Sequence, residues 1–546
     1  MNYKDLADLL FPDAKPIAYY EEKYPARNLK EGAAVVRFAP SPTGFVHIGG
    51  LYQSIINRKL ADQTGGVFIL RIEDTDQKRQ IENGVVQIVD SLKDFDIIPD
   101  EGMTGENIEK GIYGPYKQSA RKDIYQAFAK YLIEQGRAYP CFATSEELEE
   151  MRAKQESAKI RPGYYGIWAK YRTLSVDEAI EKVKAGIPWV VRFKSMGQED
   201  RKIKHHDLIK GNIEFPENDQ DIVIIKADGL PTYHFAHAVD DHLMRVTHVI
   251  RADEWLSSVP LHLELFKTLG FKTPKYAHTA SIMKEDDGKK RKISKRKDPE
   301  AAVSYYHEEG IPSQAVYEYL LNIANSNFEG WRKANPDKDI SEFKFELGKM
   351  SVSGAVFDMV KLLDVSKNVI SKYTKERLYD EVLTWAKRYD SELEEMFSGM
   401  EINFYKLSCS EGKCLVLFYR PRELEEYMNQ PKLRELIGQY GYKESNIEEM
   451  LAHLSERICE CTAQGIGFPH EIGAFLGYPT ADVQSFIEKE GRDFIMTGYW
   501  KVYSNPEKAR MIFHEYDRAK VCAVNEYLDG KNIREIALNQ RKWRNL

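Results

Sequence analysis

A histidine and two glycines follow a short apolar run near the N-terminus, in a pattern that can hold phosphate. Residues 34–39 are expected to form a buried strand, which the prolines and glycine of 40–44 end. His47-Ile48-Gly49-Gly50 then opens an expected helix over 49–62. Free N–H groups at a helix start bind anions, and His47 can donate a hydrogen bond to charge on a phosphoryl oxygen. Taken singly, each of these residues is more often an ordinary loop or turn residue.

The segments around this turn predict the start of a nucleotide-binding sheet. Gly65-Gly66 ends the expected helix, and residues 67–72 form a second expected strand. A strand, turn, helix and strand in so short a span form a βαβ unit with parallel strands. Ligands of such sheets bind at the carboxyl ends of the strands, where His47 falls.

A strongly basic run lies much later in the chain, at Lys289–Lys297. Seven of its nine residues, KKRKISKRK, are Lys or Arg. The run is either a solvated loop, an RNA-binding patch or a phosphate-binding catalytic loop. The net charge of −7 gives no bulk attraction to nucleic acid, but local basic surface acts within about 8–10 Å.

Five blocks of sequence together resemble one known family. They are RFAPSPTGFVHIGG (Arg37–Gly50), FILRIEDTD (Phe68–Asp76), GPYKQSAR (Gly114–Arg121), DGLPTYHFAHAVDDHLMRVTHVIRADEW (Asp228–Trp255) and KISKR (Lys292–Arg296). In this order, over roughly residues 34–390, the blocks resemble the class I aminoacyl-tRNA synthetases, and among them the glutamyl-tRNA synthetases. The resemblance implies ATP-dependent activation of L-glutamate to glutamyl-AMP and transfer to the 3′ end of tRNA-Glu.

The resemblance also implies the site residues. His47 and Lys295 are the expected catalytic residues, because charge stabilisation supplies most of the rate of such a reaction. The expected ATP-binding residues are His47, Gly49, Gly50, Lys292, Ser294 and Lys295. The expected glutamate-binding residues are Arg37, Ala39, Ser41, Glu73, Tyr233, His237, Arg251 and Trp255.

One pocket position departs from the family. His237 stands where the family is expected to have a small amide. An imidazole still donates a hydrogen bond, but its charge is expected to vary near neutral pH. Glutamate stays the favoured substrate, since Arg37 and Arg251 are kept and arginine suits carboxylates.

Magnesium is expected with ATP as substrate, and no protein ligand for a metal is predicted. Some relatives hold zinc in the inserted domain, which needs four ligands. Here Cys141 stands without partners, and Gly163–Ser175 contributes none. No zinc is therefore expected.

The predicted fold class is α/β, a Rossmann-like doubly wound parallel sheet with additions. The predicted segments are an N-terminal extension (1–33) packed through Leu6, Leu9, Leu10 and Phe11, the first half of the catalytic domain (34–117), an inserted acceptor-end-binding domain (118–205), the second half with the KISKR loop (206–310), a helical stem-contact region (311–395) and a C-terminal module of unknown function (396–546).

The C-terminal module lacks the family's helical anticodon-binding pattern. Through FPHEIGAFLGYP (Phe468–Pro479) and GYWKVY (Gly498–Tyr503) it resembles an uncharacterised bacterial domain. Its expected strands are Phe404–Ser408 and Lys413–Tyr419, and its expected helices are Arg422–Tyr440 and Glu444–Gln464. His470 and Glu471 are expected to cap a helix whose Ile472, Phe475 and Leu476 pack inward, rather than to catalyse.

Composition places the chain in the cytoplasm. Six cysteines are too few for a disulfide framework, and no run of 18 apolar residues or signal peptide is found. The expected partners are tRNA, ATP and L-glutamate, with no membrane, and the expected state is a monomer. Two alternatives stay open: a paralogue that gives glutamate to another acceptor, such as a modified tRNA nucleoside, and a non-catalytic RNA-binding paralogue. A glutaminyl enzyme is a further neighbour.

Overall fold

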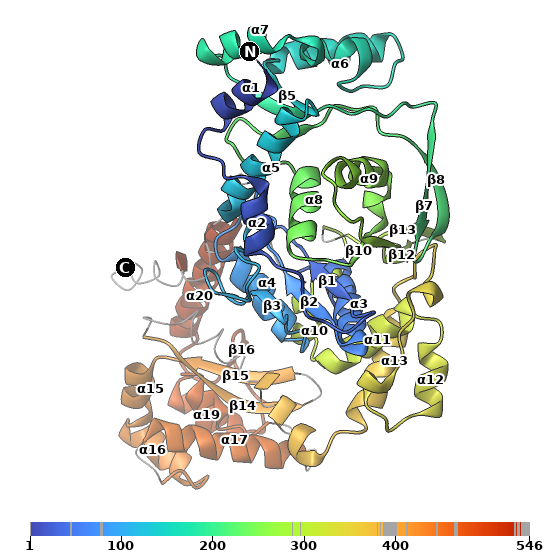
Figure 1. Ribbon diagram of the computed structural model, residues 1–546. Helices are drawn as coiled ribbons and strands as arrows, with labels where there is room; N and C mark the ends of the chain where they lie inside the picture. The colour runs from blue at the N-terminus through green and yellow to red at the C-terminus, as the bar shows by residue number, and fades with distance from the viewer. Residues whose placement is uncertain are drawn as a thin grey trace. The chain divides into compact units, whose positions relative to one another are not determined.

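The chain forms two compact units, Met1–Val382 and Leu383–Leu546 (Figure 1). The computed structural model describes residues 2–43, 46–76, 80–286, 288–294, 296–378, 380–382, 384–385, 401–410, 413–443, 446–463, 468–528, 531 and 535–536. The division at Val382 falls inside the predicted helical region 311–395. The boundaries of the predicted segments stay predictions.

The predicted βαβ unit is present at the centre of the first unit. Strand β1 (Val35–Phe38) leads through helix α3 (Ile48–Thr64) to β2 (Val67–Leu70), and the two strands pair in parallel with Val35 opposite Val67. Gly65 ends α3 in the left-handed conformation, at a φ of 62°. Gly66 has no room for a side chain, because a Cβ there would lie 1.9 Å from Ala34 O.

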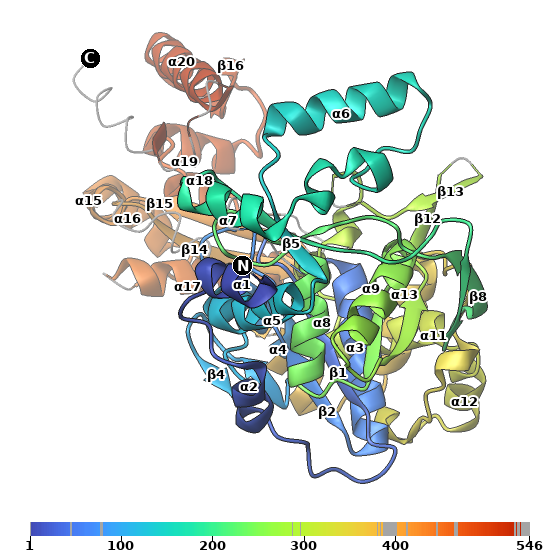
Figure 2. The same ribbon diagram turned by 45° about the horizontal axis from the view of Figure 1, so that its top comes forward.

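The sheet continues on one side of this unit, and a separate two-stranded sheet lies next to its other side. β3 (Glu101–Met103) pairs in parallel with β2, and β4 (Glu109–Lys110) adds an antiparallel edge. On the other side, β10 (His248–Ala252) pairs in parallel with β11 (Lys275–Thr279). The N–H of Thr247, just before β10, donates to Val35 O at 2.9 Å and places β10 beside β1. Helix α3 packs on β1, β2 and β10 (Figure 2). The predicted α/β class with a parallel sheet is confirmed.

Other elements surround this sheet. The helices of the first unit are α1 (Tyr3–Leu10), α2 (Ile17–Lys23), α4 (Gly84–Lys93), α5 (Lys122–Glu134), α6 (Ser145–Ser157), α7 (Val176–Lys184), α8 (Tyr233–Leu243), α9 (Val259–Thr268), α10 (Ser304–Glu308), α11 (Ser313–Ala324), α12 (Phe328–Ala334) and α13 (Met359–Ile370). Its further strands are β5 (Ala138–Cys141), β6 (Val190–Phe193) and β9 (Val223–Ile225) in one sheet, the pair β7 (Lys202–Asp207) and β8 (Gly211–Pro216), and the pair β12 (Met283–Asp286) and β13 (Lys289–Lys292).

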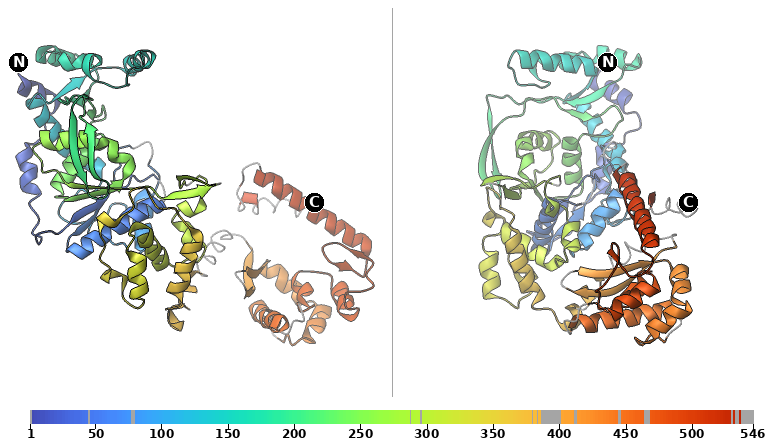
Figure 3. Two further views of the ribbon diagram at one scale, coloured as in Figure 1. Left: turned by 90° about the vertical axis from the view of Figure 1, so that its right-hand side faces the viewer. Right: turned by 180° about the vertical axis from the view of Figure 1, so that it is seen from behind.

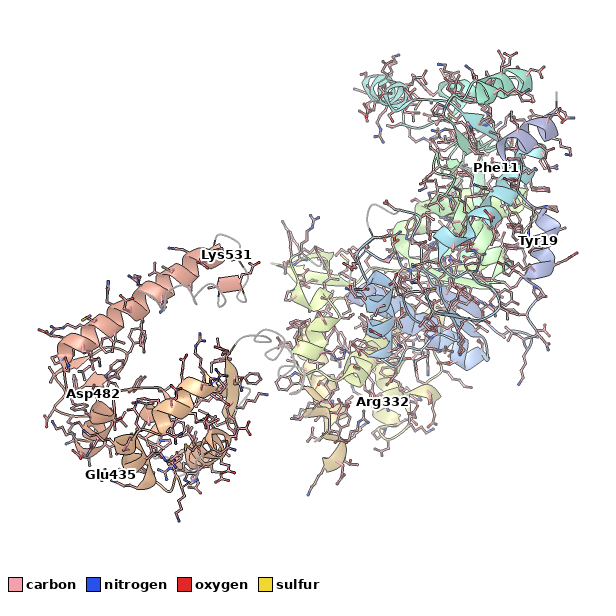
Figure 4. All side chains as sticks on the ribbon, turned by 90° about the vertical axis from the view of Figure 1, so that its left-hand side faces the viewer. Phe11, Tyr19, Arg332, Glu435, Asp482 and Lys531 are labelled. Carbon is pink, nitrogen blue, oxygen red and sulfur yellow. The ribbon has the colours of Figure 1, made fainter. Side chains whose placement is uncertain are left out.

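The N-terminal extension packs on the body of the first unit, as predicted. Leu6, Leu10 and Phe11 are buried, and the Phe11 ring meets Trp189 edge to face at 5.8 Å (Figure 4). Leu9 is 36% exposed, so its predicted inward packing is wrong. It lies on the outer face of α1, because that short helix turns only one side to α5 and α7.

The second unit is a mixed α/β module with its own core, drawn in orange and red in Figure 3. The predicted strands are present as the antiparallel hairpin β14 (Asn403–Ser410) and β15 (Lys413–Tyr419). The helix predicted over 422–440 is wrong. Two helices, α15 (Pro421–Met428) and α16 (Pro431–Gly438), take its place because a proline begins a helix and cannot continue one. The remaining elements are α17 (Ile447–Ala463), α18 (Ile472–Phe475), α19 (Thr480–Glu488), β16 (Met496–Thr497), β17 (Lys501–Val502) and α20 (Pro506–Leu528).

The FPHEIGAFLGYP and GYWKVY motifs line one pocket of about 450 Å³. Glu471 stands at the N-cap position of α18, so the predicted helix start is present, but its side chain makes no capping hydrogen bond. It is 1% exposed and pairs with Arg457. Leu476 is 45% exposed, which makes its predicted inward packing wrong as well. The Glu471 carboxylate forms an ion pair with Arg457 instead, a tertiary contact that the local sequence does not predict.

Asp482 holds the two motifs together. Its buried carboxylate accepts hydrogen bonds from Trp500 Nε1 at 2.9 Å and from the N–H groups of Tyr503 (3.0 Å) and Ser504 (2.8 Å) (Figure 4). The ring N–H and the backbone N–H groups all donate to this one carboxylate. For these donors the described part of the second unit shows no other acceptor. A charged, buried acceptor of this kind is costly to remove.

We therefore expect Asp482→Asn to destabilise the second unit by about 1–3 kcal/mol, because the amide nitrogen would face the Trp500 N–H, donor against donor. Hydrogen exchange of peptides within 480–504, measured in the full chain, reports this loss. The exposed Glu507→Gln is the control. Equal protection in both variants would contradict the role given to Asp482.

Candidate active site

His47 caps the N-terminus of α3 with its own ring. Its Nδ1 accepts a hydrogen bond from the Gly49 N–H at 3.0 Å. A ring nitrogen that accepts carries no proton, so the neutral ring has its proton on Nε2. In this tautomer the nitrogen of His47 that can donate is Nε2, and the ring lies at the positive end of the 17-residue helix α3.

The turn around His47 leaves little space for side chains. A Cβ on Gly50 would lie 3.2 Å from Phe38 Cζ, and one on Gly49 would lie 3.3 Å from His47 Nδ1. Both glycines keep the helix start open to a phosphate group. His47 also forms an antiparallel bridge with Ala302, which follows the KISKR segment. The chain that follows the KISKR segment therefore lies beside the His47 turn, although some 250 residues separate His47 from Ala302 in sequence.

Asp298 organises the end of the KISKR segment, a residue that sequence reasoning missed. It accepts the Ser294 N–H at 2.8 Å, and the Arg291 guanidinium binds it at 2.6 and 2.7 Å. The pairing with Arg291 holds the pKa of this carboxyl far below its usual range. Lys292 is exposed and pairs with Glu254 at 2.6 Å. Lys295, predicted to be catalytic, lies outside the residues that the structure describes.

The predicted amino-acid pocket begins with buried charge on β1. Arg37 is 4% exposed, and its Nε donates to both oxygens of Asp241, at 3.1 and 3.3 Å. Arg71 donates to Asp241 at 2.6 Å and to Glu73 at 3.2 Å. Burial raises the pKa of Glu73 against the pull of these arginines. Each buried charge here has a partner of opposite sign, as a low-dielectric interior requires.

A second carboxylate continues this network. Asp240 accepts from Arg121 at 2.7 Å, Gln118 at 2.9 Å and Tyr125 at 2.8 Å. Helix α8 supplies both Asp240 and Asp241, while Arg37 and Arg71 come from β1 and the residue after β2, and Arg121 from the 3-10 helix Gln118–Arg121. These residues join the two halves of the fold beneath the pocket.

Arg251 differs from Arg37, Arg71 and Arg121 because the acceptors around it are all uncharged. It is 4% exposed, and its guanidinium lies 3.0 Å from His278 Nε2, 3.2 Å from His262 Nδ1, 3.3 Å from Trp255 O and 3.4 Å from the Tyr233 hydroxyl. In the described part of the chain no carboxylate pairs with it directly. A buried guanidinium without an anion is a site for an anionic ligand group.

The aromatic residues predicted for the pocket lie against Arg251. The rings of Tyr233 and Trp255 have centroids 4.1 Å apart, and both side chains are partly exposed. Ala39 is partly buried and Ser41 is exposed on the turn after β1. Glu73 lies next to this turn, because its backbone N–H donates a hydrogen bond to Pro40 O at 3.0 Å. Their predicted contacts with a substrate stay predictions.

His237 lies beneath Tyr233 rather than at the surface of the pocket. It is 0% exposed, and its Nε2 lies 2.9 Å from the Tyr276 hydroxyl. Its Nδ1 is 2.8 Å from Asp241 Oδ2, without the angle of a hydrogen bond. Burial lowers the pKa of His237 to about 3, although Asp241 acts in the opposite direction. The prediction that its charge varies near neutral pH is therefore wrong.

Cys141, considered above as a zinc ligand, is a core residue. It is 1% exposed, and its Sγ lies 3.4 Å from the Tyr164 hydroxyl. Among the described residues, no three His, Cys, Asp or Glu side chains gather in a way that could hold a metal ion. No helix among them is long and apolar enough to cross a membrane.

The geometry suits transfer chemistry on a phosphate. Hydrogen-bond donors of the His47 turn lie on one side, a basic segment lies next to them, and a buried cation stands at the base of an aromatic pocket. Such a site can position reactants and stabilise charge.

Two known families match this chain. Residues 33–364 match "tRNA synthetases class I (E and Q), catalytic domain", and residues 365–537 match "Protein of unknown function (DUF3793)". Both resemblances predicted from the sequence, to the synthetases and to an uncharacterised domain, are thereby confirmed.

Individual relatives agree with the family match. A glutamate--tRNA ligase of Clostridium perfringens (strain 13 / Type A) is 59% identical over 402 residues, which are 73% of this chain and 74% of the relative. That of Acetivibrio thermocellus is 53% identical over 409 residues, or 74% and 75% of the two chains. A crystal structure of a glutamate tRNA ligase from Elizabethkingia meningosepticum, in complex with its amino acid, has a TM-score of 0.58 and 27% identity over 83% of this chain and 92% of that chain.

Buried neutral histidines make the fold sensitive to acid. Burial lowers the pKa of His234 to about 4 and that of His237 to about 3. In the unfolded chain both take up protons below about pH 6.5, so stability falls as the pH falls, by about 2 kcal/mol for each histidine between pH 7 and 5.

We expect His237→Asn to remove about half of this combined loss, measured by urea unfolding at pH 7 and pH 5. The control is His206→Asn, since His206 is exposed on β7. An unchanged pH dependence in His237→Asn would show that this imidazole is not buried in its neutral form.

Proposed function

The chain belongs to the class I tRNA synthetases for glutamate and glutamine, and we propose that it is a glutamate–tRNA ligase. It activates L-glutamate with ATP to form glutamyl-AMP and then transfers the glutamyl group to the 3′ end of tRNA-Glu. The two relatives named above, both glutamate–tRNA ligases, support this function.

The observation that carries the choice of glutamate is the lack of an anionic partner on Arg251. A substrate carboxylate supplies the missing charge and accepts the one guanidinium N–H that the four contacts of Arg251 leave over. The amide of glutamine is neutral and leaves the buried cation uncompensated, which costs free energy. Arg37, whose charge Asp241 already offsets, supports the rest of the substrate from β1.

In the first step an oxygen of the glutamate α-carboxylate attacks the α-phosphorus of ATP. The bond from the α-phosphorus to the bridging oxygen breaks, and pyrophosphate leaves. His47 Nε2–H is proposed to bind the phosphates, for which Gly49 and Gly50 leave space at the start of α3. Lys292, Ser294 and Lys295 are proposed to supply further contacts to them. Magnesium enters bound to ATP and offsets phosphate charge.

In the second step a ribose hydroxyl of the terminal tRNA adenosine attacks the carbonyl carbon of glutamyl-AMP, and AMP leaves. Residues 118–205 are proposed to hold this acceptor end, and residues 311–395 are proposed to contact the stem. We place the reaction in the cytoplasm and assign a monomer. The replaced C-terminal module leaves open how the anticodon is read.

Glutamate-dependent exchange of pyrophosphate into ATP tests the activation step. With tRNA present, we expect glutamate to support exchange far better than glutamine. Arg251→Gln is expected to raise the KM for glutamate about a hundredfold, since it removes a charged, buried hydrogen-bonding partner. The control is Arg492→Ala, whose side chain is 79% exposed in the second unit. Equal use of glutamine by the wild type would rule out the proposed specificity.

The acceptor is tested with labelled glutamate and total tRNA. Label at the 3′ end, released by mild base as an ester, is the expected result. Activation without charging would favour the paralogue that serves another acceptor. Absence of exchange with either amino acid would favour the non-catalytic paralogue.

A further inference from the structure

A chain of buried hydrogen bonds ends on Arg251. Asp207 at the end of β7 lies 2.6 Å from His278 Nδ1, through its Oδ2, and Arg251 Nε donates to His278 Nε2 at 3.0 Å. None of these three side chains is more than 4% exposed. Three strands, β7, β11 and β10, each contribute one member. We call Asp207, His278 and Arg251 the arginine relay.

Asp207 determines which nitrogen of His278 carries the proton. Its carboxylate also accepts the N–H groups of Ile209 and Lys210, each at 2.9 Å. Burial raises the pKa of Asp207, but hydrogen bonds from His278 and from these backbone groups outweigh burial and lower this pKa to about 2. An ionised carboxylate only accepts, so His278 Nδ1 donates to it. The Nε2 lone pair is then left for Arg251.

The imidazole separates two opposite charges. A carboxylate in direct contact with Arg251 would satisfy the guanidinium and compete with the substrate. A neutral imidazole fixes the direction of the guanidinium and leaves its charge for a ligand. His262 supports the other side in the same way, since its ring lies between Arg251 and His234, 2.9 Å from His234 Nδ1.

We propose that Asp207 and His278 are positioning residues that hold Arg251 for the side-chain carboxylate of glutamate, an inference that rests on the proposed function. They touch no substrate and act through the direction and availability of one guanidinium. Their replacement therefore alters recognition of glutamate more than recognition of ATP. Their replacement is therefore expected to change kcat less than it changes the KM for glutamate.

The direct test is Asp207→Asn, assayed by pyrophosphate exchange at saturating tRNA. The Asn oxygen can keep the backbone N–H groups, while its amide donates to His278 Nδ1 and forces the ring proton onto Nε2, against Arg251. We expect the KM for glutamate to rise at least tenfold, with kcat and the KM for ATP changed less than about threefold.

Asp482→Asn is the matched control. Asp482 is likewise a buried carboxylate that accepts a ring N–H and several further donors, here two backbone N–H groups and the Ser504 hydroxyl, but it lies in the second unit. Its variant is expected to lose stability and to keep the wild-type KM for glutamate. A similar rise in the KM for glutamate in Asp207→Asn and Asp482→Asn would show that the rise comes from general destabilisation. That result would overturn the proposal.

A second pair of variants separates orientation from stability. His278→Gln keeps an acceptor near Arg251, whereas His278→Asn keeps only a donor toward Asp207. We expect Gln to rescue most of the affinity for glutamate that Asn loses, at similar melting temperatures. If both variants have the wild-type KM for glutamate, the proposed role of the arginine relay is overturned, while the proposed function stands. A wild type that fails to use glutamate would overturn the proposed function with it.

Discussion

The adjacent buried carboxylates Asp240 and Asp241 hold the catalytic fold together. A buried ion costs several kcal/mol unless partners surround it, and each of these carboxylates has arginine partners from distant parts of the chain. Asp241 binds Arg37 of β1 and Arg71 after β2, so the strand ends cannot move away from α8. Tyr233 and His237 lie on that same helix. The position of the amino-acid pocket therefore follows from charge pairing under it, and apolar packing alone would not fix it.

The parts of the fold that sequence predicted are those that short-range rules determine. The βαβ unit and the hairpin β14–β15 follow from apolar runs broken by glycine and proline, and the phosphate-binding turn at His47 follows from its place after the first strand. The family resemblance then supplied Arg37, Glu73, Tyr233 and Arg251 as a set. The structure connects Arg37 to Glu73 through Asp241 and Arg71, places Tyr233 against Arg251, and brings the segment after KISKR next to His47.

What sequence could not supply depends on pairs far apart in the chain. Asp207 and His278 are 71 residues apart, and neither stands in a recognisable motif. The state of His237 depends on complete burial, which no local pattern reports. Glu471 resembles a helix cap, yet a tertiary partner, Arg457, takes its carboxylate. Pro431 is different, because a proline interrupts a helix in any context and so predicts the division between α15 and α16.

The cores of the two units share no member among the described residues. One contains buried side chains from Leu6 to Val369, and those of the second unit run from Leu407 to Phe513. Among the described residues each unit buries apolar side chains of its own, so a substitution in one core changes the packing of that core first. For evolution this means that an entire C-terminal module can be exchanged by recombination without rebuilding the catalytic interior. A chain that keeps a common catalytic half beside an unfamiliar partner domain is then an accessible outcome of a single joining event.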